Sequence, residues 1–308
     1  MKISAFTYVR NGKTFGYPFI ESIKSLLPIV DEYIVVVGDS SDGTREAVEN
    51  IGDDKIKIVD TIWDDNLRKD GKVFAQQANI GLDNTSIESD WLFHLQADEV
   101  IHEKDYPIIL QNLEQNLSNK KVDGFLLRFI NFFGDFNHYC PSRRFHQREI
   151  RIIRNDRSIR SYKDSMGFRK FHNPELVNEK GTKLLVKQIE AAVYHYSWSK
   201  APKTQKAKNI EFSKRYHPTD DFIKDFDAVH GEAYDYHQYD YLKVFTGSHP
   251  AAIQQVVAAQ DWEFIYDPSR NNMTRKEKIM KFLEMLTGKQ FFIYKNYKVK
   301  KCFDSMGW

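Results

Sequence analysis

Apolar runs of strand length alternate with helical segments through the first hundred residues, and this alternation limits the possible folds more than any other feature. Between the runs, apolar residues recur at helical spacing or a polar turn opens a helix. The predicted elements are strand 2–9, helix 18–30, strand 33–38, helix 42–52, strand 55–63, helix 72–82 and strand 90–100. Strand–helix–strand units form parallel sheets with right-handed crossovers. The sequence therefore predicts an α/β fold with a doubly wound, mostly parallel sheet.

The alternation loosens after about residue 120. Strand-like runs at 122–133 and 189–198 flank a basic segment at 143–155. From about residue 203, helical stretches rich in Lys and Tyr dominate. We expect a first domain at 1–200 and a helical C-terminal region at 201–308.

Composition narrows the class of protein. The 45 basic and 43 acidic residues give a formal charge of +2, which does not indicate a nucleic-acid-binding protein. The two cysteines, Cys140 and Cys302, lie far apart and predict neither a disulfide framework nor a zinc site. No signal-peptide pattern and no window of about 20 apolar residues is present. We expect a cytoplasmic protein without a membrane span.

Acidic residues follow two of the predicted parallel strands. Asp39 and Asp42 lie in the turn GDSSDGT, and Asp98 and Glu99 lie in LQADEV. Ligands of doubly wound sheets bind at the carboxyl ends of the strands, where these turns meet. The first turn can equally be a helix cap with a turn glycine, and acids at a strand end can simply be solvated. Together, two such turns favour a nucleotide diphosphate held with Mg²⁺ or Mn²⁺.

Five stretches in this order resemble the family 2 glycosyltransferases of the GT-A fold, especially bacterial enzymes of lipopolysaccharide-core and surface-glycan synthesis. They are FTYVRNG, VVVGDSSDGT, ANIGL, QADE and HYSW, and the resemblance covers roughly residues 2–200. It implies a nucleotide-sugar-binding catalytic domain that moves a sugar from a nucleotide-diphosphate sugar, with a UDP-sugar as the first choice, to the hydroxyl of a glycan or lipid-linked acceptor. It also implies a metal-assisted, inverting reaction. We expect the C-terminal region, which lies beyond the resemblance, to be on the acceptor side or peripheral to a membrane.

The resemblance also assigns roles to individual residues. It implies a nucleotide pocket lined by Val9, Arg10 and Asn11, contacts to base and ribose from Asp39 and Asp42, and positions near the donor phosphates for Asn79 and Gly81. Asp98 matches the second Asp of the family's D-x-D motif and is the implied metal ligand, and His195 matches a histidine near the metal or diphosphate. Gln96 stands where the first Asp would be, so it can accept a hydrogen bond from ribose but adds no charge. His195 could instead be a hydrogen-bonded core residue.

An inverting transfer needs a general base for the acceptor hydroxyl. Glu175, in FHNPELV, resembles the family's His-Glu segment and is the first choice. Glu149, in HQREIRIIRN, is the second. Glu149 could instead form an ion pair with a neighbouring arginine, and Glu175 could be an exposed loop acid.

Two further interpretations remain open. A non-catalytic protein that binds sugar nucleotides or glycans on a degenerate GT-A fold is the main alternative, because Gln96 departs from the motif. Residues 275–301 carry nine Lys or Arg against two Glu, interleaved with aromatic and aliphatic residues. This segment could rest on the inner face of the cell membrane or pack on its own domain.

A dehydrogenase is excluded because the loop RNGKTFG after the first strand lacks G-x-G-x-x-G. A nucleotidylyltransferase would carry a Gly-rich loop with Arg or Lys right after the first strand. RNGKTFG is not such a loop, so the sequence does not favour this class either.

Overall fold

A long, curved sheet organises the computed structural model, which describes residues 1–175, 177, 181–287 and 292–300. Within these residues the sheet has 11 strands in the path β13-β7-β6-β8-β4-β1-β2-β3, with β12 alongside β6 and with β5 and β14 on β12. A second sheet has the order β11-β10-β9. Its strands are β9 (Ile159–Ser161), β10 (Phe168–Lys170) and β11 (Thr182–Lys183).

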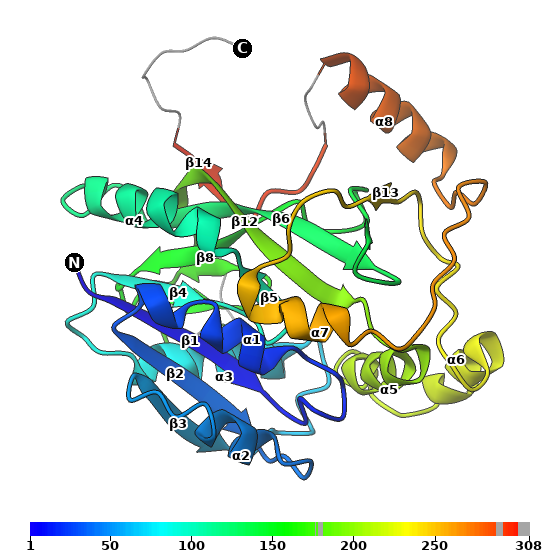
Figure 1. The fold of residues 1–308 in the computed structure, drawn as a ribbon. Helices are drawn as coiled ribbons and strands as arrows, with labels where there is room; N and C mark the ends of the chain where they lie inside the picture. Colours follow the sequence, from blue (N-terminus) through cyan, green and yellow to red (C-terminus); the bar gives the residue numbers. More distant parts are fainter. Residues whose placement is uncertain (176, 178–180, 288–291, 301–308) are drawn as a thin grey trace.

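The N-terminal part of the main sheet is parallel, as predicted. It consists of β1 (Ile3–Val9), β2 (Glu32–Gly38), β3 (Ile56–Thr61) and β4 (Trp91–His94). β1 pairs in parallel with β2 and with β4, and β2 pairs in parallel with β3. The connections carry α1 (Phe19–Lys24), α2 (Thr44–Glu49) and α3 (Lys72–Asn84). The carboxyl ends of these strands therefore meet at one edge (Figure 1).

The remaining strands make the sheet mixed. They are β5 (Glu99–Ile101), β6 (Gly124–Phe133), β7 (His138–Tyr139), β8 (Arg148–Arg154), β12 (Leu185–Trp198), β13 (Lys243–Val244) and β14 (Lys298–Val299). β8 is antiparallel to both β4 and β6, whereas β12 runs parallel to β6. The predicted α/β class with a doubly wound sheet is confirmed, and antiparallel strands complete the sheet.

Apolar side chains cover both faces of the sheet, which explains why the N-terminal strands are continuously apolar. One core joins the sheet to α1, α2 and α4 (Tyr106–Gln115), through residues such as Ile23, Val48 and Leu113. The other joins it to α3 and to the small sheet, through Ala78, Leu82 and Phe168.

The prediction of a single strand over 90–100 is wrong in one respect. β4 and β5, separated by a turn, occupy this range. β4 ends at His94, and the chain turns before β5, which pairs antiparallel with β12. In the turn, the Glu99 N–H donates to the Gln96 carbonyl at 3.0 Å, and Glu99 Oε2 accepts the Gln96 N–H at 3.1 Å. The interruption therefore places Gln96 and Asp98 on a tight turn rather than on a strand.

The C-terminal region contains helices and two short strands. The helices are α5 (Pro202–Ser213), α6 (Phe222–His230), α7 (Gln254–Ala258) and α8 (Arg275–Thr287). Short 3-10 helices lie at Leu27–Ile29, Glu103–Asp105 and Ala251–Ile253. β13 and β14 pair with β7 and β12, so the region beyond residue 200 also extends the main sheet. In the described part of the chain, no helix is both long and apolar enough to cross a membrane.

We predict that Gly124→Ala destabilises the fold. A Cβ at Gly124 would lie 2.3 Å from the backbone oxygen of Ile152 on β8, and a backbone atom cannot move aside as a side chain can. We expect the free energy of unfolding to fall by about 1–3 kcal/mol in denaturant titrations. Gly52→Asn is the control, because Gly52 has a φ of +68° with open space around it and Asn tolerates that conformation. Equal stability of Gly124→Ala and wild type would contradict the predicted clash.

Candidate active site

Asn11 ties together the loops that follow β1 and β2. It has a positive φ of 49°, and its N–H donates to Ser40 Oγ at 3.0 Å while its Oδ1 accepts the Ser41 N–H at 3.0 Å. Both hydrogen bonds join the loop after β1 to the loop after β2. The structure thus uses Asn11 to position the two loops relative to each other.

Asp42 caps the turn that opens α2. Its Oδ1 accepts the Thr44 N–H at 3.0 Å, and its Oδ2 accepts the Thr14 N–H at 2.8 Å. Partial burial opposes ionisation, but the hydrogen bonds from Thr44 and Thr14 outweigh it and lower the pKa of Asp42. These contacts brace the turn before α2, whose N-cap residue is Gly43 rather than Asp42.

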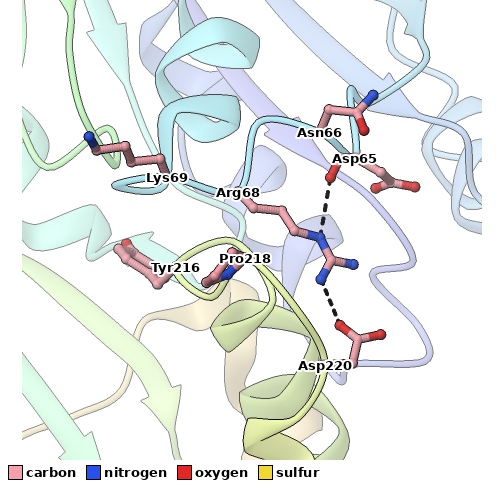
Figure 2. Close-up of a pocket in the computed structure, with 7 residues that line it drawn as sticks. All are labelled: Asp65, Asn66, Arg68, Lys69, Tyr216, Pro218 and Asp220. Atoms are coloured by element: carbon pink, nitrogen blue, oxygen red, sulfur yellow. Dashed lines mark hydrogen bonds and ion pairs between the residues drawn. The ribbon is translucent and has the colours of Figure 1, made fainter.

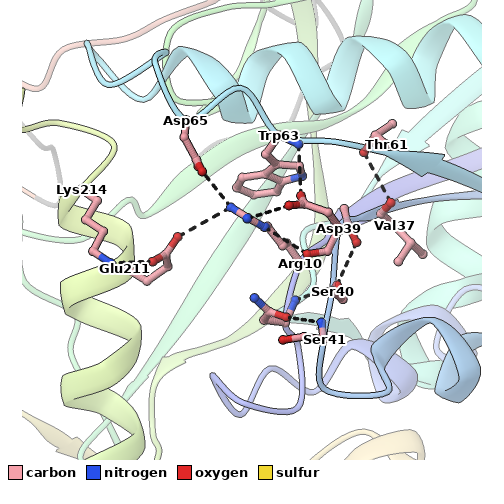
Figure 3. Close-up of polar contacts among 12 residues, drawn as sticks. Arg10, Val37, Asp39, Ser40, Ser41, Thr61, Trp63, Asp65, Glu211 and Lys214 are labelled. Carbon is pink, nitrogen blue, oxygen red and sulfur yellow. Dashed lines mark hydrogen bonds and ion pairs between the residues drawn. The ribbon is translucent and has the colours of Figure 1, made fainter.

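Arg10 is the centre of an ion-pair cluster between the N-terminal loops and α5 (Figure 3). Its guanidinium lies 2.8 Å from Asp39 Oδ2, 3.4 Å from Asp65 Oδ1 and 3.9 Å from Glu211 Oε1. Arg215 also pairs with Asp65, at 2.7 Å, and with Glu211. The cluster connects the ends of β1 and β2 to a helix that begins more than 150 residues later.

Trp63 contacts both arginines of this cluster. Its ring centroid is 5.7 Å from Arg10 Cζ and 5.5 Å from Arg215 Cζ, within the range of cation–π contacts. Its backbone N–H donates to Asp39 Oδ1 at 3.1 Å. Its indole packs over Gly38, where a Cβ would come within 2.5 Å of Nε1. Gly38 therefore makes room for the indole.

A cavity of about 620 Å³ opens beside this cluster, within the usual range of about 300–1,000 Å³ for small-molecule sites. One aromatic wall contains Tyr8, Trp63, Phe74 and Phe212. A second aromatic wall contains Phe145, Trp198, Phe226, His230 and Tyr234. Polar residues that also line the cavity include Arg10, Gln96, Asp98, Asn131, Glu149, Arg151, His195 and Lys208. The cavity thus combines apolar walls with convergent polar groups.

Asp98 and His195 face each other in this cavity. Asp98 Oδ1 lies 3.7 Å from His195 Nε2, and His195 Nδ1 lies 2.9 Å from Asn131 Oδ1. Because the Asn131 oxygen accepts, Nδ1 carries the proton and Nε2 keeps its lone pair. Burial lowers the pKa of His195 and keeps the ring neutral. Burial alone would raise the pKa of Asp98, but His195, Lys208 and Lys200 lower it, so Asp98 is a carboxylate.

This pair has the chemistry of a divalent-metal site. Its two facing atoms are closer than twice a metal–ligand distance of about 2.1 Å, so one ion can contact both. Asn131 orients the histidine as outer-shell acceptors do in metal sites. Among the described residues, no group of three or more His, Cys, Asp and Glu could hold a metal. The remaining ligands would have to be water or phosphate oxygens.

Two buried lysines, Lys200 just before α5 and Lys208 within it, approach Asp98. Lys208 Nζ donates to Ser197 and lies 5.3 Å from the Trp198 ring centroid. Lys200 Nζ donates to the carbonyls of Gly16 and Tyr196. Burial lowers the pKa of both, that of Lys200 to about 7, and Asp98 opposes the shift. Lys208 lines the cavity and offers it a positive charge near Asp98.

Glu149 also lines the cavity, and its carboxyl oxygens have almost no hydrogen-bond partners among the described residues. Its Oε1 lies 3.6 Å from His146 Nδ1, and its buried Oε2 accepts no hydrogen bond from the described residues. Burial raises the pKa of Glu149 to about 8, although Arg151 opposes the shift. A carboxyl with a pKa near neutrality in a ligand cavity suits general acid–base chemistry.

The ion pair considered for Glu149 is made by Glu99 instead. Arg151 donates through Nε and Nη2 to the two carboxylate oxygens of Glu99, at 2.7 and 2.6 Å. Both side chains are buried. Glu99 is therefore committed to Arg151, and Asp98 is the carboxylate of this turn that faces the cavity.

Six candidates from the sequence lie outside the cavity lining, namely Asn11, Asp39, Asp42, Asn79, Gly81 and Glu175. The buried Asn79 side chain pairs with the backbone N–H and C=O of Ser161, and Gly81 lets α3 pack against Phe6 and Val36. Glu175 is exposed, and its N–H is capped by Asn173. Asp39 borders the cavity through Arg10 rather than lining it. The structure brings Val9, Arg10, Gln96, Asp98, Glu149 and His195 together.

Sequence reasoning missed several lining residues. Trp63, Phe74 and Phe212 build the first aromatic wall, and Lys208 and Arg215 come from or follow α5. In the sequence these residues sit in ordinary helical or loop patterns, and no spacing signals that they meet. Arg151 belongs to the basic segment noted at 143–155, which could have pointed to it.

A second hollow of about 760 Å³ lies nearby and is lined by Asp65, Asn66, Arg68, Lys69, Tyr216, Pro218 and Asp220 (Figure 2). Arg68 pairs with Asp220 at 2.7 Å and also donates to the Asp65 carbonyl. The charged groups of this hollow thus largely form ion pairs or hydrogen bonds with protein groups. Its described lining residues include acids and a lysine but no imidazole.

Comparison with known proteins gives only distant matches. No protein-family model and no curated protein matches this chain. Among solved structures, S. aureus TarS has a TM-score of 0.36 at 16% identity, covering 69% of this chain and 39% of TarS. Residues 1–349 of TarS in complex with UDP give 0.36 at 16%, covering 70% and 65%. This chain thus spans less than two thirds of either TarS chain.

Two other structures are similar at the same low level. Mycobacterium tuberculosis glucosyl-3-phosphoglycerate synthase, in complex with Mn²⁺, UDP and glucosyl-3-phosphoglycerate, gives 0.29 at 19% identity, covering 43% of this chain and 45% of that chain. The 4-diphosphocytidyl-2C-methyl-D-erythritol synthase of Anaerococcus prevotii gives 0.32 at 11%, covering 50% and 70%. Scores this low do not support an argument about function, which therefore rests on the site.

We predict that Glu149 makes stability fall as pH rises. The carboxyl titrates near pH 8 in the folded chain but near about 4.3 when unfolded, so between these values unfolding releases a proton that the folded state retains. Its contribution is complete below about pH 4.3 and is lost by about pH 8. Glu149→Gln should therefore gain stability relative to wild type between pH 5 and 8, by about 1 kcal/mol or more. Denaturant titrations across this range measure it, with the exposed Glu175→Gln as control. A constant difference across the range would contradict the raised pKa.

Proposed function

We propose that this protein is a glycosyltransferase that transfers a sugar from a nucleotide diphosphate sugar, with a UDP-sugar as the first candidate, to an acceptor hydroxyl. The observation that carries the proposal is one cavity that holds a bare imidazole nitrogen facing the Asp98 carboxylate and a carboxyl, Glu149, with a pKa near neutrality. The imidazole nitrogen and the Asp98 carboxylate can hold a metal ion beside a donor diphosphate. The Glu149 carboxyl can accept the proton of an attacking hydroxyl. The finer assignment to the family 2, GT-A enzymes rests on the sequence motifs.

The donor nucleotide is placed on the side of β1 and β2. Val9 and Arg10 line this end of the cavity, and ligands of doubly wound sheets bind at the carboxyl ends of such strands. Trp63 and Tyr8 offer aromatic faces for a base, and Gln96 offers an amide for a ribose hydroxyl. Asp39 and Asp42 act in this scheme through the loop: Asp39 holds Arg10, and Asp42 holds the turn.

A divalent ion, Mn²⁺ or Mg²⁺, would be held by Asp98 and His195 together with the donor's phosphate oxygens. When bound, such an ion neutralises the charge that develops on a departing diphosphate. Lys208 adds an amine beside the same carboxylate, and its protonated form lowers the pKa of Asp98. Gln96 supplies no charge where the D-x-D motif has its first carboxylate, so the ion is held less tightly. Lys208 can compensate, because it also neutralises charge on the diphosphate.

Glu149 is the proposed general base. As a carboxylate it takes the proton of the acceptor hydroxyl while that oxygen forms its bond to the anomeric carbon. The bond from this carbon to the diphosphate oxygen breaks at the same time, and its electron pair leaves with the diphosphate. Attack from the face opposite the leaving group inverts the anomeric centre. Glu175, the other candidate, lies exposed and outside the lining of this cavity.

The aromatic wall of Phe145, Trp198, Phe226, His230 and Tyr234 is the proposed acceptor side. The apolar faces of sugar rings pack on aromatic side chains, and part of this wall belongs to α6 of the C-terminal region. A glycan or lipid-linked acceptor in bacterial surface polysaccharide or lipopolysaccharide synthesis, used from the cytoplasm, is the corresponding proposal for pathway and location.

Calorimetric titration with UDP, with and without Mn²⁺, tests the donor site. We expect Mn²⁺-dependent binding that Asp98→Asn weakens at least about tenfold, because the carboxylate charge holds the ion. Asp83→Asn is the matched control, since Asp83 pairs with Arg160 on the surface of α3. Absence of UDP, GDP and CDP binding would contradict the proposal. Nucleotide binding without any hydrolysis of UDP-sugars would favour the non-catalytic alternative.

Hydrolysis of UDP-glucose and UDP-galactose by Glu149→Gln and Glu175→Gln separates the two base candidates. A general base contributes about 10²–10⁴-fold, so Glu149→Gln should lose activity by this factor while Glu175→Gln keeps it. Because Glu149 must be ionised, the wild-type rate should rise with pH and level off above about pH 8. The reverse ranking of the two variants would assign the role to Glu175.

A further inference from the structure

Helix α8 is attached to the body by one of its faces. It lies apart from the main sheet in Figure 1, where it is drawn in orange. Met280 is buried, Glu284 pairs with Arg143, and Lys281 Nζ lies 3.2 Å from the Tyr241 ring centroid. At the start of the helix, Thr274 Oγ1 accepts the Glu277 N–H at 3.2 Å, and Glu277 accepts from Thr274 in return. Both acids of α8 are therefore engaged by the protein.

The other face of α8 presents apolar side chains to solvent. Ile279, Phe282 and Leu286 are 60%, 58% and 67% exposed, and Leu283 beside them is 37% exposed. Positions three, four and seven residues apart share one face of a helix, so these side chains form a continuous stripe. No other described residue buries this stripe, and exposed apolar patches of this kind mark interaction surfaces.

Basic residues border this stripe. Arg275, Lys276 and Lys278 are exposed. At 100° per residue, Arg275 projects in line with the stripe and Lys276 and Lys278 project on either side of it. A helix with an apolar stripe, flanking Lys or Arg and too short an apolar length to span a bilayer lies in the plane of an anionic lipid surface. A second copy of the same face would instead bring like charges together.

We propose that α8 docks this protein on an anionic lipid bilayer, with Ile279, Phe282, Leu283 and Leu286 inserted among the lipids and the basic residues beside the headgroups. The apolar side chains leave water for the acyl region, and the cations attract the negative leaflet. This site is independent of the proposed transferase activity, because none of its residues lines the cavity.

Cosedimentation of the full chain with vesicles tests the proposal. Wild type should bind vesicles of phosphatidylcholine containing about one third phosphatidylglycerol far better than pure phosphatidylcholine, and less so at high salt. The double variant Phe282→Ser/Leu286→Ser should bind at least about tenfold more weakly, as should Lys276→Glu/Lys278→Glu. Ile87→Ser controls for loss of an exposed apolar residue, and Lys120→Glu/Lys121→Glu controls for net charge.

Circular dichroism and thermal unfolding confirm that each variant folds. Equal binding to neutral and anionic vesicles, or unchanged binding of Phe282→Ser/Leu286→Ser, overturns the proposal. A wild-type dimer in light scattering that this variant converts to monomer also overturns it, because the stripe is then an interface between copies. UDP binding measured in parallel shows whether the donor site stands regardless of this outcome.

Discussion

The buried ion pair between Glu99 and Arg151 determines how the site is built. Glu99 accepts two hydrogen bonds from Arg151 and one from the Gln96 N–H, so a single carboxylate joins the turn after β4 to β8. Two charges can be buried together because each satisfies the other, whereas removing one partner leaves an uncompensated charge at a cost of about 3–5 kcal/mol. The turn that carries Asp98 and the strand that carries Glu149 are therefore fixed relative to each other.

This arrangement gives neighbouring carboxyl groups different protonation states. Glu99 takes up the Arg151 guanidinium, so Glu149, two residues away on the same strand, is left without a direct cation and its pKa rises with burial. Asp98 is also buried, but His195 and Lys208 lower its pKa. One cavity thus holds a permanent carboxylate and a carboxyl that ionises near neutrality, the separation of roles that transfer to a hydroxyl requires.

The sequence predicts those parts of the structure that depend on local pattern. The strand and helix alternation and the edge where Arg10, Gln96 and Asp98 gather follow from apolar periodicity and from strand-end geometry. The break after His94 was missed because it depends on Glu99 turning back to Gln96 and on β12, which lies about 90 residues further along. The choice between Glu149 and Glu175 depends on burial, and two glutamates in polar segments look alike in sequence.

The C-terminal region completes the site rather than merely following it. Lys208 and Phe212 of α5 line the cavity, and Glu211 and Arg215 hold the Arg10 cluster from the far side. Arg10 and Arg215 share Asp65 and Glu211, so each carboxylate is balanced by two cations. Under the proposed function, an anionic donor that drew one arginine toward itself would leave the acids to the other. The contact between α5 and the N-terminal loops would then be coupled, through charge, to donor binding.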